Sequence, residues 1–196
     1  MNFLAHIYLS GEDPELMLGN FMADAVKGKK YLTYPKPIQN GIILHRAIDY
    51  YTDTHPVVRQ SISRLFPVYR HYSGVIIDVL YDHFLAKYWN DFHTQELESY
   101  IKQFYELLSA NAEVLPNRVK NFYPYMIRDN WLGSYTTLPG LKKILGQMNR
   151  RTGEKGKLDQ SITEIEADYA LFKNEFFTFF PDLITFVQAE MDKLDS

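Results

Sequence analysis

Two segments in the first half of the sequence carry acids and imidazoles at the spacing of one helical turn. His45 and Asp49 are four residues apart, and so are Asp78 and Asp82. Side chains at this spacing lie on one face of a helix. Asp78 and Asp82 stand in an otherwise apolar run, and burying carboxylates there is unfavourable unless a partner compensates their charge. The spacing therefore indicates two helices that share a polar site.

A divalent cation is the simplest single partner for several acids and imidazoles. Asn20 and Asp24 form a third pair one turn apart, and His83 directly follows Asp82. The chain has no cysteine, which excludes a thiolate zinc site, a disulfide scaffold and a cysteine nucleophile. Oxygen and imidazole ligands favour Mn²⁺, Mg²⁺ or Fe²⁺. Such an ion could polarise a phosphoryl oxygen and activate a bound water, which is the chemistry that hydrolysis of a phosphodiester needs.

Each pair, taken alone, also has an ordinary structural interpretation. His45 and Asp49 could form a surface pair worth a few tenths of a kcal/mol, and the paired aspartates could face solvent. A single histidine such as His6 is more often structural than a ligand. Arg46 could bind phosphate or form a salt bridge with Asp49 or Asp53. Only a shared site explains why three helices each carry such a pair.

Helical periodicity dominates the chain, and strand-like alternation is scarce. The sequence predicts an all-α, single-domain helical bundle over residues 1–196. Loops are expected at Lys29 to Pro37 and at Arg150 to Gly156. The expected helices are about Pro14 to Val26, Ile38 to Thr52, Pro56 to Tyr69, Ser73 to Asn90, Thr94 to Ala110, two short helices within Pro116 to Pro139, Leu141 to Met148, and about Leu158 to Leu194, kinked or split by Pro181.

The bulk composition narrows the choice of partners. The net charge of −3 gives no global basic field, so nucleic acid is not an expected partner. No apolar run approaches the roughly 20 residues that span a bilayer, and the first residues do not form a secretory signal. These features, with the absence of cysteine, fit a cytoplasmic protein.

Four segments of the chain carry a recognisable pattern: Met1 to His6, Gly19 to Asp24, Gly41 to Asp49 with Thr52 and Asp53, and Asp78 to Leu85. Together they resemble the acyl carrier protein phosphodiesterase family. Their order and spacing match through about residue 90, and the match is looser around Trp131 and from Tyr169 to Pro181. The resemblance implies an HD-domain-like fold, manganese as the usual metal, and hydrolysis of the phosphodiester that joins 4′-phosphopantetheine to a serine of acyl carrier protein.

Residue by residue, the resemblance implies a polar centre made of metal ligands and of catalytic residues next to them. The adjacent His-Asp pair of the broad HD signature is absent, so the division between metal ligands and their neighbours stays open. We expect Asp24, His45, Asp78 and His83 to bind the metal, and Asp49, Asp82 and Arg46 to act in catalysis.

The implied substrate is an acidic protein, which favours a local basic patch for docking. Lys27, Lys29 and Lys30 follow Asp24 closely, and with Asn20 they are the expected substrate-binding residues. Two other functions remain open. One is an HD-type metal phosphohydrolase that acts on nucleotides or other small phosphodiesters, and the other is a non-catalytic helical module that binds the carrier protein.

Overall fold

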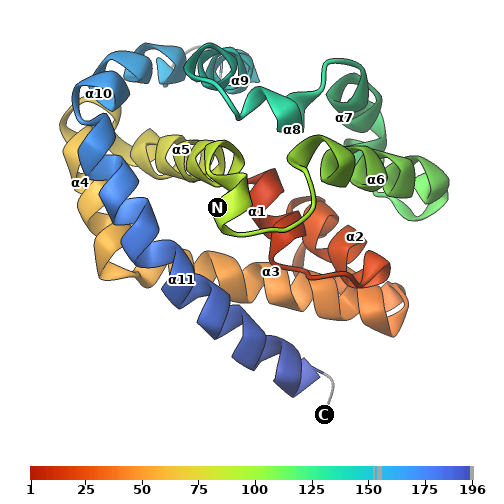
Figure 1. Ribbon diagram of the computed structural model, residues 1–196. Coiled ribbons are helices and arrows are strands. Elements are labelled where there is room, and N and C mark those ends of the chain that lie inside the picture. The colour runs from red at the N-terminus through yellow and green to blue at the C-terminus, as the bar shows by residue number, and fades with distance from the viewer. Residues whose placement is uncertain (152, 154–155, 195–196) are drawn as a thin grey trace.

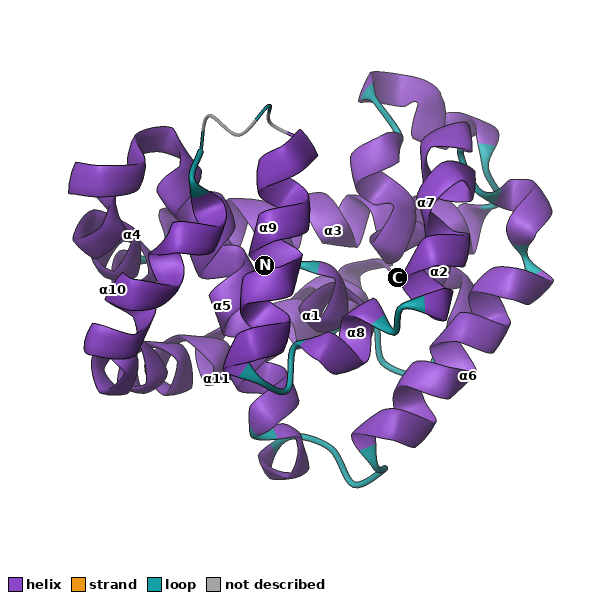
Figure 2. Cartoon of the chain, turned by 90° about the horizontal axis from the view of Figure 1, so that it is seen from above, coloured by secondary structure: helices purple, strands orange, loops and turns teal. Residues whose placement is uncertain are grey.

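The computed structural model describes residues 1–151, 153 and 156–194, and these residues form helices and loops without a strand. The all-α prediction is therefore confirmed. Figures 1 and 2 show the helices joined by short connections. The α-helices are α1 (Phe3–Tyr8), α2 (Pro14–Met22), α3 (Lys36–Thr54), α4 (Pro56–Tyr69), α5 (Ser73–Lys87), α6 (Leu97–Ala110), α7 (Asn117–Arg128), α8 (Trp131–Ser134), α9 (Leu138–Arg151), α10 (Ile162–Ala167) and α11 (Tyr169–Leu194).

Most predicted helices are present with small changes at their ends. The helix Pro56–Tyr69 is confirmed at both ends, and the stretch from Pro116 to Pro139 contains two short helices as predicted. The expected loop after Gly28 contains a 3₁₀ helix, η2 (Gly28–Thr33). The predicted loop after Arg150 falls partly outside the described residues.

The C-terminal prediction was wrong in where the long helix breaks. Pro181 lies inside α11 and does not split it. The break lies at Asp168, where the backbone leaves the helical region between α10 and α11. Ahead of α10, residues Leu158–Ser161 form the 3₁₀ helix η6 instead of α-helix. The proline is tolerated because buried side chains on both sides of it, Phe179 and Leu183, hold α11 against the core.

Helix α1 was not predicted, and it lies at the centre of the fold. It packs between α2 and α5 (Figure 1) and buries Leu4, Ala5 and Ile7. Six residues are too few for a helix that is stable by itself. The fold supplies the missing stabilisation through Asp82 of α5, whose carboxylate accepts hydrogen bonds from the backbone N–H groups at the start of α1.

Helices α2 and α3 approach each other more closely than ordinary side chains allow. The crossing is made by Gly19 of α2 and Gly41 of α3. A Cβ atom on Gly41 would overlap the carbonyl oxygen of Leu16, and one on Gly19 would overlap that of Ile38. Both positions therefore require glycine, because the obstruction is backbone and cannot move aside as a side chain would.

No helix in the described part of the chain is both long and apolar enough to cross a membrane.

We predict that Gly41→Ala lowers the free energy of unfolding by about 3 kcal/mol or more, since its methyl group forces α2 and α3 apart. Urea denaturation followed by circular dichroism measures the effect. Gly74→Ala is the matched control, because a Cβ atom there meets nothing within 4 Å. This control should be neutral or stabilise the protein by about 0.5–1 kcal/mol. Equal stability of Gly41→Ala and wild type would contradict the close crossing.

Candidate active site

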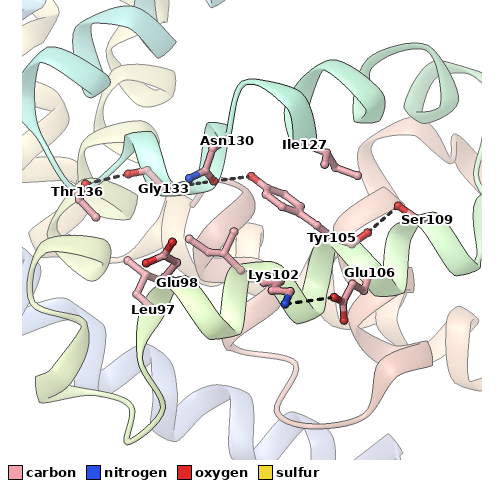
Figure 3. A pocket seen from close by; sticks show the side chains of 11 residues that line it. Leu97, Glu98, Lys102, Tyr105, Glu106, Ser109, Ile127, Asn130, Gly133 and Thr136 are labelled. Atoms are coloured by element: carbon pink, nitrogen blue, oxygen red, sulfur yellow. Dashed lines mark hydrogen bonds and ion pairs between the residues drawn. The ribbon is translucent and has the colours of Figure 1, made fainter.

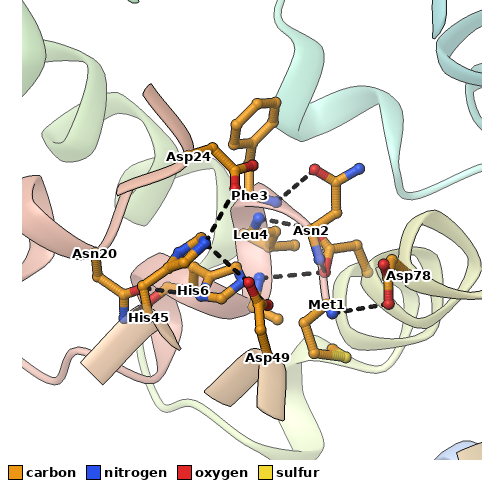
Figure 4. A network of polar contacts seen from close by, with 12 residues as sticks. Met1, Asn2, Phe3, Leu4, His6, Asn20, Asp24, His45, Asp49 and Asp78 are labelled. Atoms are coloured by element: carbon orange, nitrogen blue, oxygen red, sulfur yellow. Dashed lines mark hydrogen bonds and ion pairs between the residues drawn. The ribbon is translucent and has the colours of Figure 1, made fainter. Parts of the chain in front are cut away.

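Two histidines and two aspartates from three segments meet beside α1 (Figure 4). His6 of α1 and His45 of α3 stack with ring centroids 4.0 Å apart. Asp49, one turn after His45, lies with one carboxylate oxygen 3.3 Å from His6 Nε2 and the other 3.1 Å from His45 Nε2. Asp24, in the 3₁₀ helix η1 (Ala23–Ala25), lies 3.3 Å from His45 Nε2. The four side chains form what we call the acid–imidazole cluster.

The orientation of His6 is fixed by Asn20, which is fully buried. The Asn20 amide donates to the carbonyl oxygen of His6 and to Ser10 Oγ, so its own oxygen faces His6 Nδ1 at 2.8 Å. Because that oxygen only accepts, Nδ1 carries the proton. In neutral His6 the lone pair on Nε2 therefore points toward the Asp49 carboxylate, and two acceptors face each other. A cation bound between these two acceptors would remove their mutual repulsion.

The polar atoms of His45 also lack ordinary partners. Its side chain is buried, and neither ring nitrogen makes a hydrogen bond of acceptable geometry. Nε2 nevertheless lies within 3.3 Å of both Asp24 and Asp49. Donor atoms that surround a common point without bonding one another are typical of metal ligands. Suitable atoms of His6, His45 and Asp49 all lie within 4.8 Å of one another. These residues therefore fit a divalent cation.

The charges in the cluster are strongly coupled. Burial lowers the pKa of His45, but the carboxylates of Asp24 and Asp49 outweigh it and raise that pKa to about 9. Burial and the neighbouring His45 together lower the pKa of His6. Burial opposes ionisation of Asp49, yet the two imidazoles hold its pKa well below the ordinary range. The cluster thus keeps both carboxylates ionised and binds one proton where a cation would otherwise lie.

The cluster opens into a small pocket of about 200 Å³. Four carboxylates line it, and its described lining contains neither lysine nor arginine. Positive charge at the wall comes from the Met1 ammonium, which is 2.8 Å from Asp78, and from His45 when that residue is protonated. A phosphodiester anion would be repelled from such a pocket unless a cation were bound there. The lining consists of Met1, Asn2, Phe3, His6, Phe21, Asp24, His45, Asp49, Asp53 and Asp78.

The structure brings together only part of the site expected from the sequence. Asp24, His45 and Asp49 meet in the cluster, and Asp78 lies at the pocket wall, paired with Met1. Asp82 is completely buried outside the pocket lining. Its carboxylate accepts from the amides of Asn2, Leu4 and Ala5 at 2.7–3.3 Å, so its role is to hold α1 and with it His6.

His83, expected as a ligand, lies elsewhere. Its Nδ1 donates to the carbonyl oxygen of Tyr135 at 2.6 Å, and its Nε2 accepts from the Tyr169 hydroxyl at 2.8 Å. Both ring nitrogens are therefore occupied. A residue next to Asp82 on a helix points about 100° away from it, which takes His83 toward α8 and α11.

Arg46 also lies outside the pocket lining. Its guanidinium donates to the carbonyl oxygens of Val26 and Gly28, at 3.2 and 2.9 Å, and lies over the Tyr31 ring. These contacts hold the segment after Asp24 against α3, and they direct the guanidinium to that segment and not to the cluster. Asn20 orients His6, as described above, and Lys27, Lys29 and Lys30 are exposed on that same segment.

Sequence reasoning treated His6 as structural, and it left Asp53 out of the expected site. Asp53 continues the stripe of His45 and Asp49 by one more turn, so the helical spacing already pointed to it. The signal for His6 was its place in the first of the four resembling segments, because no acid or second imidazole lies one helical turn from it in the sequence.

A larger cavity of about 740 Å³ lies between α6, α7 and α8 (Figure 3). Its walls are mainly apolar, and its polar contacts include those between Tyr105 and Asn130 and between Lys102 and Glu106. It contains no imidazole and no group of metal-binding side chains among its described lining residues. The smaller pocket is therefore the candidate active site.

Comparison with known proteins identifies the family of this chain. The profile of the family described as acyl carrier protein phosphodiesterase matches residues 1–183. The chain belongs to this family. Proteins of that name from Yersinia pestis and Pectobacterium atrosepticum are each 32% identical to it, over 94% and 97% of this chain and 96% and 99% of the relatives. One from Photorhabdus laumondii is 33% identical over 92% of both chains. No solved structure was found to match.

For this member of the acyl carrier protein phosphodiesterase family, we predict that His83 affects stability in a pH-dependent way. Burial lowers its pKa to about 4, whereas the unfolded value is near 6.5. The unfolded chain therefore binds the proton first as the pH falls. The stabilisation is complete above pH 6.5 and is lost as the pH falls toward 4, with about 2 kcal/mol gone at pH 5.

The measurement is the free energy of unfolding at pH 7.5 and pH 5. His83→Gln should reduce the drop between these two values by about 2 kcal/mol, whereas His71→Gln, at an exposed position, should leave the drop as in wild type. A drop that is the same in His83→Gln and wild type would refute the assignment of His83 as a neutral, buried structural residue.

Proposed function

We propose that this protein hydrolyses the phosphodiester between 4′-phosphopantetheine and the serine of holo-acyl carrier protein, with a divalent cation, Mn²⁺ in the first instance, held by His6, His45, Asp49 and Asp24. Family membership supports the substrate. The observation that carries the metal is the acid–imidazole cluster, in which Nε2 of His45 and the Nε2 lone pair of His6 both face ionised carboxylates.

The cation, when bound, supplies positive charge to a phosphoryl oxygen and lowers the pKa of water. The chain's own residues then have three tasks. Asn20 keeps the Nε2 lone pair of His6 directed into the cluster, and the α3 backbone sets His45 and Asp49 one turn apart. Asp53, in the same pocket, accepts a proton, because burial and the nearby Asp78 raise its pKa above that of an ordinary carboxyl group.

The reaction needs no further reactant. The oxygen of water forms a bond to phosphorus, the bond from phosphorus to the serine oxygen breaks, and that oxygen takes a proton. The products are apo-acyl carrier protein and 4′-phosphopantetheine.

Docking of the carrier protein is assigned to the exposed segment that follows Asp24. Lys27, Lys29 and Lys30 present three positive charges there, and Arg46 holds the backbone of the segment against α3. We call these three lysines the lysine rim. An acidic partner is attracted to the lysine rim while its phosphodiester enters the pocket beside it.

We predict that EDTA abolishes release of phosphopantetheine from holo-acyl carrier protein and that added Mn²⁺ restores it, as measured by the mass of the carrier protein. His45→Gln and Asp49→Asn should each reduce the rate at least 1000-fold, because they remove donors from the cluster. His71→Gln serves as the control for loss of an imidazole outside the pocket and should retain wild-type activity.

Full activity after thorough chelation would rule the metal out. Hydrolysis of small phosphodiesters without any action on holo-acyl carrier protein would instead favour a general metal phosphohydrolase. Binding of the carrier protein without hydrolysis of either substrate would favour a non-catalytic binding module.

We predict that the double charge reversal Lys29→Glu with Lys30→Glu raises KM for holo-acyl carrier protein about tenfold at low ionic strength, with a smaller effect at high salt. Lys142→Glu with Lys143→Glu is the matched control, since both lysines are exposed on α9, away from the pocket lining. Initial rates against carrier concentration give both values. The docking assignment fails if the two double variants behave alike.

A further inference from the structure

The pocket that contains the acid–imidazole cluster has a second, aromatic side. Phe3 and Phe21 line it together with Asp24, His45 and Asp49. Figure 4 shows the Phe3 ring on the same side of the pocket as Asp24. Phe3 is only partly buried, although its neighbours along α1, Leu4 and Ala5, are fully buried. An aromatic ring therefore faces the space next to the charged groups.

This ring is the first of a continuous series. Phe122 of α7 lies 5.8 Å from Phe3 and 6.2 Å from Phe21, measured between ring centroids. Trp131 of α8 stacks on Phe122 at 6.1 Å with the planes 4° apart. Phe3, Phe122 and Trp131 are all partly exposed, and we call them the aromatic strip. The strip leads from the cluster onto α7 and α8, whereas the lysine rim lies on the segment after Asp24.

The proposed substrate has two substituents on its phosphorus with different chemistry. One is the serine of an acidic protein, which suits the lysine rim. The other is the uncharged pantetheine arm. Its first carbon is bonded to a quaternary carbon that carries two methyl groups, and amides follow further along the arm. These methyl groups lie within a few bonds of the phosphorus, so they must contact whatever lines the pocket next to the cluster. Aromatic faces bind methyl groups and stack on amides.

We infer that the aromatic strip of Phe3, Phe122 and Trp131 binds the pantetheine arm and so makes the site select phosphodiesters that carry it. This inference rests on the proposed function, because it takes the arm from that substrate. Phe3 contacts the dimethyl carbon next to the phosphate, and Phe122 and Trp131 contact the more distant part of the arm. The strip positions and selects the substrate and does not take part in the bond-breaking step.

The test compares two substrates in variants of the strip. Phe122→Ala should raise KM for holo-acyl carrier protein about tenfold, the equivalent of one aromatic contact. Its kcat/KM for methyl 4-nitrophenyl phosphate, which lacks the arm, should stay at the wild-type value. Phe122→Leu should recover most of the lost affinity and covers the case in which the alanine variant does not fold. Tyr125→Ala, an exposed aromatic on the same helix, should match wild type with both substrates.

Inhibition by the product gives a second readout that does not involve docking of the carrier. The inhibition constant of 4′-phosphopantetheine should rise in Phe122→Ala by the same factor as KM, while that of inorganic phosphate stays near its wild-type value. Trp131 also reports directly in the wild-type protein, because the chain's other tryptophan, Trp89, is buried. Its emission should change on titration with 4′-phosphopantetheine and not with phosphate.

The outcomes separate the two proposals. Wild-type protein that does not release phosphopantetheine with Mn²⁺ present refutes the proposed function itself. The aromatic strip is overturned as the arm-binding surface by three results together. Wild-type protein releases phosphopantetheine, Phe122→Ala loses activity equally toward both substrates, and Trp131 emission is unchanged.

Discussion

The close crossing of α2 and α3 is the constraint on which the rest of the site depends. Gly19 and Gly41 let the two backbones touch. Asn20 follows the crossing on α2, and His45 lies one turn beyond it on α3. With larger residues at the crossing the helices would stand several ångströms further apart, and distances of about 3 Å between Asp24 and His45 could not form. The absence of side chains at Gly19 and Gly41 thus sets the geometry of the acid–imidazole cluster.

The site also depends on the placement of α1. The residue that holds α1 shows that a buried carboxylate need not be catalytic. Burial raises the pKa of Asp82 to about 7, even though three backbone amides at the start of α1 donate to it. The carboxylate replaces the partners that a short helix lacks at its N-terminus. His6 then projects from α1 into the cluster, and Asn20 fixes its orientation. Asp82 and Asn20 therefore support the site without lining the pocket.

Charge is separated over a short stretch of chain. The pocket concentrates carboxylates, while the lysines gather on the segment directly after Asp24. On the proposed function, an acidic carrier protein is attracted to these lysines, and its phosphate would need a cation to offset the acids of the pocket. Arg46 links the two regions, since it belongs to the α3 helix of the cluster and holds the lysine-bearing segment. The aromatic strip begins at Phe3 in the wall of the same pocket and continues outside it to Phe122 and Trp131, and we infer that these uncharged rings suit the uncharged arm of the substrate.

The sequence by itself determined the helical class, most helix positions and the residue pairs at one-turn spacing, because periodicity and one-turn spacing are local properties. It also placed Asp24, His45 and Asp49 among the site residues. The tertiary structure alone decided that His6 joins them and that His83 does not. His83 follows Asp82 in sequence but points to Tyr135 and Tyr169. Helix α1 was missed for the same reason, since its stabilisation comes from a carboxylate nearly 80 residues away. Spacing along a helix indicates which side chains share a face, but only packing decides what that face meets.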